Sequence, residues 1–383
     1  MKKTYDFCII GAGSIGLPLS YYLSKKGVAV VVIDMLASPG RGQNRSAIGG
    51  IRATHSDNAK IKICKESIRI ISNFKDEHGI EVDWIQGGYL FPVYDEMIER
   101  DLKSILDFQK SCGLNIDWVG PKDVGELVPG INSDGLRGGI YSPEDGHASP
   151  LKTADAYYLL SCRNGVEFRF REKVTGFDRK GGEIRAVLTD KGDYPVGFVV
   201  NCAGAEAREV GGLLGIDLPV YPDSHEGGIT EPVKRFFYPM VVDLRKGPTS
   251  ANYYFYQNAE GQIVFCMTPD PVIPGKDIDC TSQFLPEVTE RMLNLLPRLR
   301  SIRVRRTWRG LYPMTPDGLP VVGYDVNYDN LFHAVGMCGQ GFMIGPGLGK
   351  ILSEIFIENN LEYSDILDEL SPYRNFDAEE KLK

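Results

Sequence analysis

Long apolar runs are missing from this chain of 383 residues. No stretch reaches the ~18 consecutive apolar residues that would predict a membrane-spanning helix. The N-terminal segment MKKTYDFCIIGAG is not typical of an export signal, because its apolar part is short, is interrupted by glycine and lacks a small-residue cleavage site. We therefore expect no membrane span, no export signal and a cytoplasmic location.

Positive charge is also scarce. The 43 lysines and arginines are outnumbered by 51 aspartates and glutamates, which gives a formal net charge of −8. A surface that binds nucleic acid needs a basic face for the phosphates. The composition therefore argues against a nucleic-acid partner.

Metal-ligand and disulfide patterns are absent as well. The eight cysteines form no Cys-x-x-Cys pair, and the five histidines are scattered without the spacing of metal ligands. This usage is typical of reduced, cytoplasmic cysteines. It predicts neither a disulfide framework nor a metal site.

Glycine, in contrast, is concentrated near both ends of the chain. CIIGAGSIG occupies residues 8–16, and AVGMCGQGFMIGPGLG occupies residues 334–349. A chain of this length is expected to form two domains. The first cluster lies between two predicted buried strands, YDFCII (5–10) and VAVVVID (28–34), with a helix that ends at Gly27.

The spacing within this first unit is typical of dinucleotide binding. Gly11 permits a tight turn, Gly13 the close approach of a pyrophosphate, and Gly16 the close packing of helix on strand. Asp34 can accept hydrogen bonds from an adenosine ribose, and the helix N-terminus attracts phosphates. The unit therefore predicts a bound dinucleotide, but it does not distinguish NAD from FAD.

The residues after Asp34 favour FAD. In an NAD-only fold the alternation of strands and helices would continue, whereas here a loop rich in glycine and short polar residues, 35–57, comes first. Such a loop fits a chain that runs beside an extended ligand, and a flexible surface loop is the alternative. The second glycine cluster also precedes a predicted helix, an arrangement suited to a polar or anionic ligand.

The middle of the chain predicts a second unit. YPVGFVVNCAGAEA (194–207) is typical of a buried strand that returns to the dinucleotide domain, and residues 220–305 contain runs typical of antiparallel strands. In NYYFYQ, Tyr254 and Tyr256 point to one face of their strand. Aromatic crowding in a strand favours a core over a pocket.

Four blocks carry a family resemblance: IIGAGSIG…VVVID, RSAIGGIR, NCAGAEA, and WRGLYPMTPDGLPVVG…HAVGMCGQGFMIGPGLGKILSE. In this order they resemble the flavin-dependent amine and amino-acid oxidoreductases of the D-amino-acid oxidase superfamily over nearly the whole chain. Within it the chain is most similar to the sarcosine oxidase β subunit and to β subunits of L-proline dehydrogenase complexes. Glycine oxidase and D-amino-acid dehydrogenase are more distant.

The resemblance implies FAD and an α/β fold with two parts. A Rossmann-like FAD/NAD(P)-binding domain would comprise residues 1–79, 151–219 and 306–383. A mixed or antiparallel-sheet substrate domain of the D-amino-acid oxidase type would comprise 80–150 and 220–305. The isoalloxazine would lie between residues 45–52 and 336–343, so the two glycine clusters would hold opposite ends of one cofactor.

The cofactor contacts implied by the motifs and the resemblance extend along the whole chain. They are Gly11, Ala12, Gly13, Ser14, Ile15, Gly16, Asp34, Met35, Arg45, Ser46, Ala47, Gly49, Gly50, Ile51, Val174, Ala203, Gly204, Gly310, Gly336, Gly339, Gln340, Gly341, Phe342 and Met343.

Departures from the family pattern narrow the interpretation. Gly310 stands where monomeric sarcosine oxidases have the cysteine that attaches flavin, so we expect non-covalent FAD. Met343 replaces their lysine after GHGF, and Tyr312 replaces the carboxylate-binding arginine of glycine oxidase. No lysine occurs in 261–268, where monomeric sarcosine oxidase uses one to activate oxygen. This favours a dehydrogenase.

A substrate with an α-carboxylate would need a cationic partner in a dry pocket. Arg52 is the first candidate and Arg309 the second, with a surface ion pair or a cofactor contact as the alternative for each. Tyr254, Tyr256 and Tyr312 are candidates to bind the carboxylate or to line the pocket. The amine would bind neutral and transfer a hydride to flavin N5, giving an imine.

Three functions remain open from the sequence. The first is an FAD-dependent oxidase or dehydrogenase for a secondary-amine amino acid such as sarcosine or L-proline. The second is a glycine or D-amino-acid oxidase or dehydrogenase. The third is a flavin-binding electron-transfer subunit without its own substrate site. A partner subunit or a homo-oligomer is compatible with each.

Overall fold

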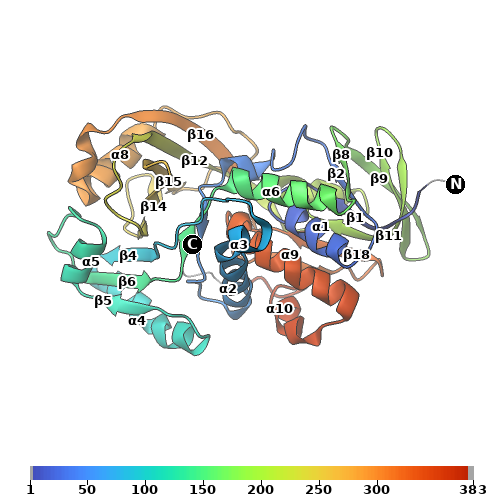
Figure 1. Cartoon of the computed structure of the whole chain (residues 1–383), viewed down its shortest axis with the longest axis horizontal. Coiled ribbons are helices and arrows are strands. Elements are labelled where there is room, and N and C mark those ends of the chain that lie inside the picture. Colours follow the sequence, from blue (N-terminus) through green and yellow to red (C-terminus); the bar gives the residue numbers. More distant parts are fainter. Residues whose placement is uncertain (1–2, 378–383) are drawn as a thin grey trace.

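The computed structural model describes residues 3–377 and contains two large sheets that lie next to each other (Figure 1). The first sheet and its helices form one half of the molecule, and the second sheet forms the other half. This mixed α/β architecture confirms the predicted fold class.

The first sheet has eight strands and a parallel centre. Its main order is β17-β18-β11-β1-β2-β8. Outside this order, β10 pairs antiparallel with β11, and β9 pairs antiparallel with β10. The strands are β1 (Tyr5–Ile10), β2 (Val30–Asp34), β8 (Glu167–Phe170), β9 (Val174–Lys180), β10 (Glu183–Thr189), β11 (Asp193–Asn201), β17 (Val321–Tyr324) and β18 (Leu331–Val335). β1 and β2 are nearly continuous apolar runs because helices cover the sheet.

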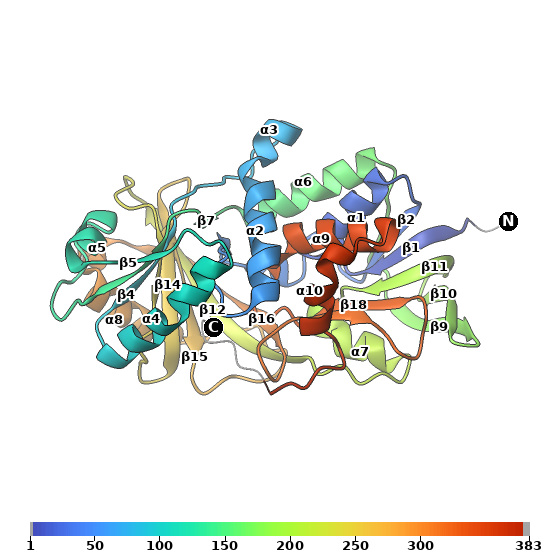
Figure 2. The same cartoon turned by 90° about the horizontal axis from the view of Figure 1, so that it is seen from below.

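The helices around the first sheet pack closely through glycine. They are α1 (Gly16–Lys25), α2 (Asn58–Ser72), α3 (Phe74–His78), α6 (Pro150–Arg163), α7 (Ala207–Gly212), α9 (Gly341–Glu358) and α10 (Ser364–Glu369). α9 crosses beside both α1 and α2 (Figure 2). A Cβ at Gly345 would lie 2.0 Å from the Ser14 carbonyl oxygen, and one at Gly347 would lie 2.1 Å from the Ile63 carbonyl oxygen. Part of the second glycine cluster therefore serves helix packing.

The second sheet also has eight strands, in the order β16-β12-β15-β14-β13-β4-β6-β5. Its pairings are antiparallel except for β13 with β4. The strands are β4 (Tyr89–Val93), β5 (Asp117–Val119), β6 (Gly138–Ser142), β12 (Tyr221–Pro232), β13 (Met240–Asp243), β14 (Ser250–Gln257), β15 (Gln262–Pro269) and β16 (Val304–Met314). α4 (Glu96–Ser111), α5 (Pro121–Leu127) and α8 (Phe284–Leu295) accompany it.

One segment differs from its predicted assignment. Residues 306–314, which the sequence places with the dinucleotide domain, continue β16 and pair with β12 in the second sheet. Val304–Met314 forms one long antiparallel strand with a single register shift near its start, so the crossing back to the first sheet comes only after Met314.

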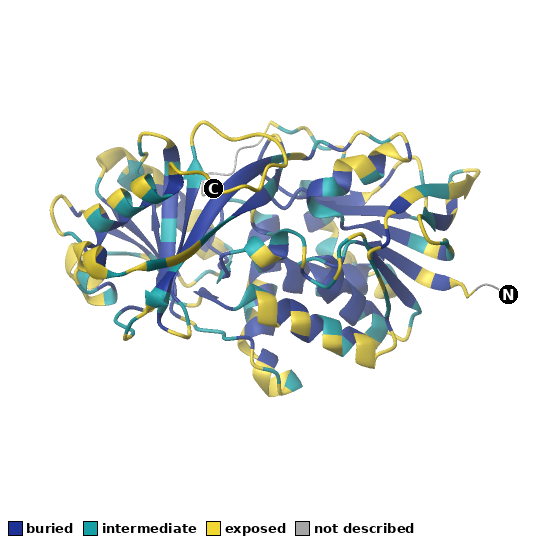
Figure 3. Ribbon diagram, turned by 90° about the horizontal axis from the view of Figure 1, so that it is seen from above, coloured by how far each residue is buried: buried dark blue, intermediate teal, exposed yellow. Residues whose placement is uncertain are grey.

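Short elements connect the two halves. They include the two-residue strands β3 (Gly50–Ile51) and β7 (Gly146–His147) and the 3₁₀ turn η1 (Gln43–Ser46). Three further 3₁₀ turns lie within one half each: η2 (Gly204–Glu206) and η4 (Leu361–Tyr363) in the first, and η3 (Pro297–Ser301) in the second. Burial is concentrated in the strands of both sheets and in the helix faces that meet them (Figure 3). Among residues 3–377, no helix combines the length and the apolar character needed to cross a membrane.

Candidate functional site

A cavity of about 810 Å³ extends from the first sheet to the second. Its lining includes the turn after β1, the end of β2, the segment 42–50, the inner face of the second sheet and the start of α9. The volume is in the upper part of the range of small-molecule sites, which is about 300–1,000 Å³.

At the first sheet, the cavity begins at the turn between β1 and α1. Gly11 has a φ of +110°, and a Cβ at Gly16 would lie 1.9 Å from the Gly11 carbonyl oxygen. A Cβ at Gly13 would meet no protein atom within 4 Å. Two glycines therefore permit the backbone path, and the third leaves open space for a ligand beside the N-terminus of α1.

Asp34 closes this end of the cavity. Its carboxylate accepts hydrogen bonds from the backbone N–H of Ala12 and of Leu36, both at 2.7 Å. Burial raises the pKa of Asp34, and the two N–H groups oppose that rise. The side chain is thus held at the carboxyl end of β2, where the motif predicts a ribose contact.

The segment 43–50 forms the middle of the cavity wall, and the second sheet holds it in place. The Trp308 indole N–H donates to the Ser46 carbonyl at 2.9 Å, and the Tyr256 hydroxyl donates to the Ile48 carbonyl at 2.6 Å. Gln43 accepts from the Leu311 N–H at 2.8 Å. This part of the predicted loop is therefore ordered by contacts with residues far along the chain.

An aromatic and polar group covers the second sheet at the cavity. The Tyr254 and Tyr312 hydroxyls are 2.7 Å apart, and the His225 ring stacks on the Tyr312 ring with centroids 3.6 Å apart. His225 Nε2 lies 3.0 Å from an Asp223 oxygen. Burial raises the pKa of both tyrosines well above the usual value and that of Cys266 to about 11, so these groups stay protonated at neutral pH.

Arg52 brings a buried cation to the cavity wall. Its side chain is 7% exposed, lies 5.9 Å from the centre of the Phe91 ring and donates to the Thr54 carbonyl. Asp145 is nearby and accepts from the Ala53 N–H at 2.8 Å and the Thr54 hydroxyl at 2.6 Å. Burial raises the pKa of Asp145 to about 6, while its hydrogen bonds and Arg52 act to lower it.

The N-terminus of α9 forms another part of the cavity wall. Gly339, Gln340, Gly341, Phe342 and Met343 all line it, and none of them carries a charge. A Cβ at Gly339 would lie 2.2 Å from the Tyr312 ring. Only glycine therefore allows this turn to pack against the second sheet.

Most residues expected at the cofactor or substrate come together in this cavity. The predicted residues that line it are Gly11, Gly13, Ser14, Ile15, Asp34, Met35, Ser46, Ala47, Gly49, Gly50, Arg52, Val174, Ala203, Gly204, Tyr254, Gly310, Tyr312, Gly339, Gln340, Gly341, Phe342 and Met343. The others are not in the lining: Ala12, Gly16, Arg45, Ile51, Gly336, Tyr256 and Arg309.

Two of the proposed substrate residues have other contacts. Arg309 is not in the cavity lining, and its guanidinium pairs with the Asp277 carboxylate at 3.0 Å and the Asp279 carbonyl at 2.8 Å. It therefore anchors the loop after β15. Tyr256 stands behind the segment 43–50 and supports it through Ile48.

Several cavity residues were not among the predicted site residues. Asp223, His225, Asn252 and Thr268 all line the cavity, and the Thr268 hydroxyl donates to the Asn252 side-chain oxygen at 2.9 Å. The sequence feature that could have identified them is the two-residue period of the strands, which places these side chains on the sheet face that also carries Tyr254. Within residues 3–377, no group of three or more His, Cys, Asp and Glu side chains could hold a metal ion.

The groups that line the cavity fit a flavin dinucleotide. The space at Gly13 is open, Asp34 faces the same space, and the cavity continues past the segment 43–50 to a second helix N-terminus. Two helix N-termini on the wall of one long cavity suit a ligand that carries both phosphates and a polar ring.

Comparisons with known proteins agree with this geometry. Residues 6–355 match the DAO family, described as FAD dependent oxidoreductase. Sarcosine oxidase subunit beta of Rhodobacter capsulatus is 23% identical, over 97% of this chain and 89% of that protein. The solved structure of L-proline dehydrogenase from P. horikoshii superposes with a TM-score of 0.91 at 28% identity, over 98% of each chain.

A further relative is longer than this chain. Mitochondrial sarcosine dehydrogenase of Mus musculus is 24% identical over 94% of this chain, which spans only 40% of that protein's length. The family match covers nearly the whole described chain and includes both glycine clusters. The chain therefore belongs to the DAO family of FAD-dependent oxidoreductases, with FAD as its cofactor, as the sequence motifs predicted.

Proposed function

We propose that this chain oxidises the C–N bond of a small secondary-amine amino acid, of the sarcosine or L-proline kind. The names of its relatives support this substrate class: sarcosine dehydrogenase, sarcosine oxidase subunit beta and L-proline dehydrogenase. Bound FAD would supply the redox chemistry by accepting a hydride from the carbon next to the amine, while the protein supplies position and charge.

In this proposal the ADP half of FAD binds at Gly13 and Asp34, and the flavin ring lies between residues 45–52 and 336–343. The continuity of the cavity between these segments supports the arrangement. Binding would be non-covalent. Gly310 carries no side chain, and the buried Cys338 thiol lies 3.2 Å from the Thr315 hydroxyl and has a raised pKa because of burial.

The observation that carries the proposal is the buried guanidinium of Arg52. Of the two cations that line the cavity within residues 3–377, Lys173 is exposed and precedes Val174 near the dinucleotide turn, whereas Arg52 is buried next to Phe91. A substrate carboxylate in a dry pocket needs such a partner, because an unpaired buried charge is costly. Arg52 would therefore hold the carboxylate and orient the amine.

Tyr254 and Tyr312 would complete the substrate wall. Their raised pKa values keep both hydroxyls neutral, so they can bind a carboxylate or amine by hydrogen bonds without adding charge. The apolar bodies of these rings and of Phe91 would exclude water from the reacting carbon. The amine would have to bind in its neutral form, and no separate catalytic base is then required.

We further propose that the electrons pass to a carrier other than oxygen. β15 presents Cys266 and Thr268 to the cavity and has no lysine, which removes one means of activating oxygen. A partner subunit is part of this proposal, because the Rhodobacter capsulatus relative is named as one subunit of a larger enzyme. The small amino acid remains the substrate of this chain.

The test is anaerobic bleaching of the flavin band in the purified FAD-bound chain. Sarcosine, L-proline, glycine and D-alanine are added in turn, and air is readmitted afterwards. Bleaching by sarcosine or L-proline, with slow recovery in air, is the expected result. Bleaching only by glycine or D-alanine would overturn the substrate class.

The variant Arg52→Met tests the role of the guanidinium in this assay. This variant should keep its FAD and lose the bleaching at substrate concentrations that reduce the wild type. If none of the four amines bleaches the wild-type flavin, the proposal that this chain by itself oxidises such an amino acid fails, and a flavin-binding electron-transfer subunit is the alternative that remains.

A further inference from the structure

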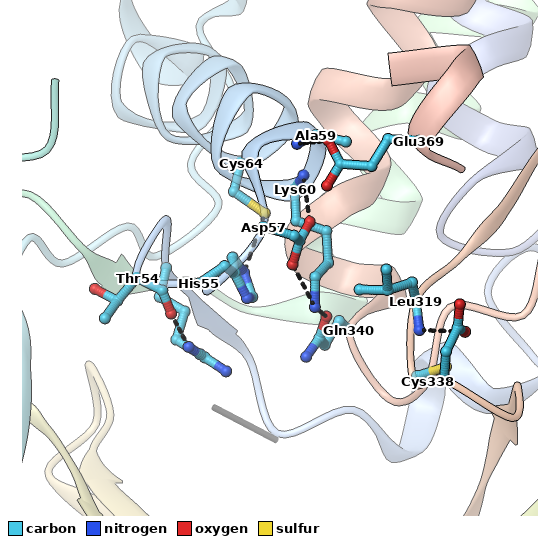
Figure 4. Close-up of polar contacts among 12 residues, drawn as sticks. Thr54, His55, Asp57, Ala59, Lys60, Cys64, Leu319, Cys338, Gln340 and Glu369 are labelled. Carbon is cyan, nitrogen blue, oxygen red and sulfur yellow. Dashed lines mark hydrogen bonds and ion pairs between the residues drawn. The ribbon is translucent and has the colours of Figure 1, made fainter. Parts of the chain in front are cut away.

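A lysine is completely buried behind the N-terminus of α9. Lys60, on the first turn of α2, has 0% exposure. Its Nζ lies 3.2 Å from an Asp57 carboxylate oxygen and 3.1 Å from the side-chain oxygen of Gln340 (Figure 4). Removing an ammonium group from water costs several kcal/mol unless its charge and hydrogens are matched. The fold keeps a costly group at this place and gives it an ion-pair partner, Asp57, and a hydrogen-bond acceptor, Gln340.

The contact with Lys60 orients the amide of Gln340. A lysine ammonium can only donate, so the amide oxygen must face Nζ and the NH₂ group must face away from it. Figure 4 shows the amide nitrogen on the side opposite Lys60. Gln340 immediately precedes α9 and lines the cavity. The lysine thereby selects which end of the amide is presented to a ligand.

The charge of Lys60 also matters at the N-terminus of α9. Residues 339–343 are uncharged, so the helix N-terminus and the nearby Lys60 are sources of positive potential there, in addition to Arg52 on the cavity wall. The acidic neighbours lie on the other side of Lys60: Asp57 caps α2 through the Lys60 N–H at 2.9 Å, and Glu369 accepts from the Ala59 N–H at 3.0 Å. Gln340 is the side chain that connects this ion pair to the cavity.

The geometry points to Lys60 as a positioning residue for the flavin ring, acting through Gln340. It holds the amide of Gln340 with its N–H donors toward the ring and adds positive potential where a reduced flavin gains negative charge. The reduced cofactor is therefore bound more tightly, relative to the oxidised cofactor, than it would be without Lys60. The inference rests on the proposed position of the ring next to residues 336–343, and it does not depend on the identity of the amine.

The experiment measures the midpoint potential of bound FAD by titration with dithionite against a reference dye, without any amine. The variants are Lys60→Met, Lys60→Arg, Gln340→Leu and the double variant Lys60→Met/Gln340→Leu. Lys62→Met is the matched control, since Lys62 is on the same helix but is exposed and pairs with Asp365. The dissociation constant of oxidised FAD is measured for each variant.

Lys60→Met is expected to weaken binding of reduced FAD about tenfold relative to oxidised FAD. For a two-electron couple this ratio corresponds to a potential about 30 mV more negative. Lys60→Arg should recover most of the shift, and Lys62→Met should leave the potential unchanged. Because Lys60 acts in part through Gln340, the double variant should shift the potential by less than the sum of the shifts of the two single variants.

A purely structural Lys60 predicts other results. A folded, FAD-bound Lys60→Met protein with the wild-type potential would overturn the inference, and so would additive shifts in the double variant. If Lys60→Met does not fold, Gln340→Leu decides: a more negative potential supports the inference, and an unchanged one overturns it. Because dithionite replaces the amine, a failure of the proposed substrate class leaves these measurements intact.

Discussion

Two glycines of the first turn should respond in opposite ways to replacement by alanine. A Cβ at Gly16 would lie 1.9 Å from the Gly11 carbonyl oxygen and 3.1 Å from the Ile9 side chain, so the backbone must move. Overpacking of this kind costs about 1–3 kcal/mol. A Cβ at Gly13 would meet no protein atom within 4 Å, so the FAD-free protein should change by less than about 0.5 kcal/mol.

For FAD binding, Gly13 should be the more sensitive of the two positions. If the pyrophosphate of FAD passes Gly13, a methyl group there takes ligand space at a cost of about 1–3 kcal/mol, which is roughly a 5–150-fold increase in Kd. Gly16→Ala should instead lower the Tm of the FAD-free protein by about 2–12 °C, at roughly 2–4 °C per kcal/mol for a domain of 150–250 residues.

Thermal unfolding followed by circular dichroism, with and without FAD, measures the Tm, and quenching of flavin fluorescence measures the Kd of FAD. The expected pattern is a normal Tm with weak FAD binding for Gly13→Ala, and a low Tm for Gly16→Ala. An unchanged Kd in Gly13→Ala would refute the placement of the pyrophosphate. A Tm loss in Gly13→Ala as large as that in Gly16→Ala would refute the steric reasoning.

Three other variants test the rest of the site. Arg52→Met should lower kcat/KM for the proposed amino acid by about 10²–10⁴-fold with FAD still bound, because one partner of a buried charge pair is worth about 3–5 kcal/mol. Arg52→Lys should not restore it, and equal losses with an amine that has no carboxylate would contradict the role. Tyr312→Phe removes the hydroxyl that lies 2.7 Å from the Tyr254 hydroxyl and should lower the free energy of unfolding by about 1–2 kcal/mol. Urea denaturation measures this, and an unchanged midpoint would mean that the hydroxyl pair does not stabilise the fold. Burial lowers the pKa of His147 to about 3, so the unfolded chain binds a proton that the folded chain does not, and stability falls as pH drops from 6.5 toward 3. His147→Gln removes this dependence, so the wild type should lose about 2 kcal/mol relative to the variant between pH 6.5 and 4.5; parallel curves would show that the histidine protonates in place.

The dinucleotide half of the site was predictable because its signals are local. The turn, the helix and Asp34 lie within one strand-helix-strand unit, and each follows from residue spacing along about 30 positions. The same holds for the face shared by Tyr254 and Tyr256, which depends only on the alternation of side chains in a strand. Tyr254 lines the cavity whereas Tyr256 supports the segment 43–50, and that difference depends on the neighbouring elements.

The position of Lys60 shows the limit of local patterns. In α2, Lys60 shares one helical face with Ile63, Cys64 and Ser67, all of them buried. The 3.6-residue period therefore indicates a lysine on the buried face of the helix, which is unusual for a charged residue. The period alone does not reveal that Gln340 accepts its hydrogen bond, because the two residues are 280 positions apart. Arg309 is a similar case, since its direction follows from the pairing of β16 with β12.

The sequence by itself determined the first dinucleotide turn, because glycine spacing and strand periodicity limit the local backbone geometry. The resemblance of its four motif blocks implied the family and FAD, and the family match confirms both. The tertiary structure decided which side chains share the cavity: Arg52 and His225 line it, whereas Arg309 anchors a loop and Lys60 lies behind Gln340. The physical reason is that burial and pairing of a charge depend on which distant elements pack around it, and no period along the chain encodes that packing.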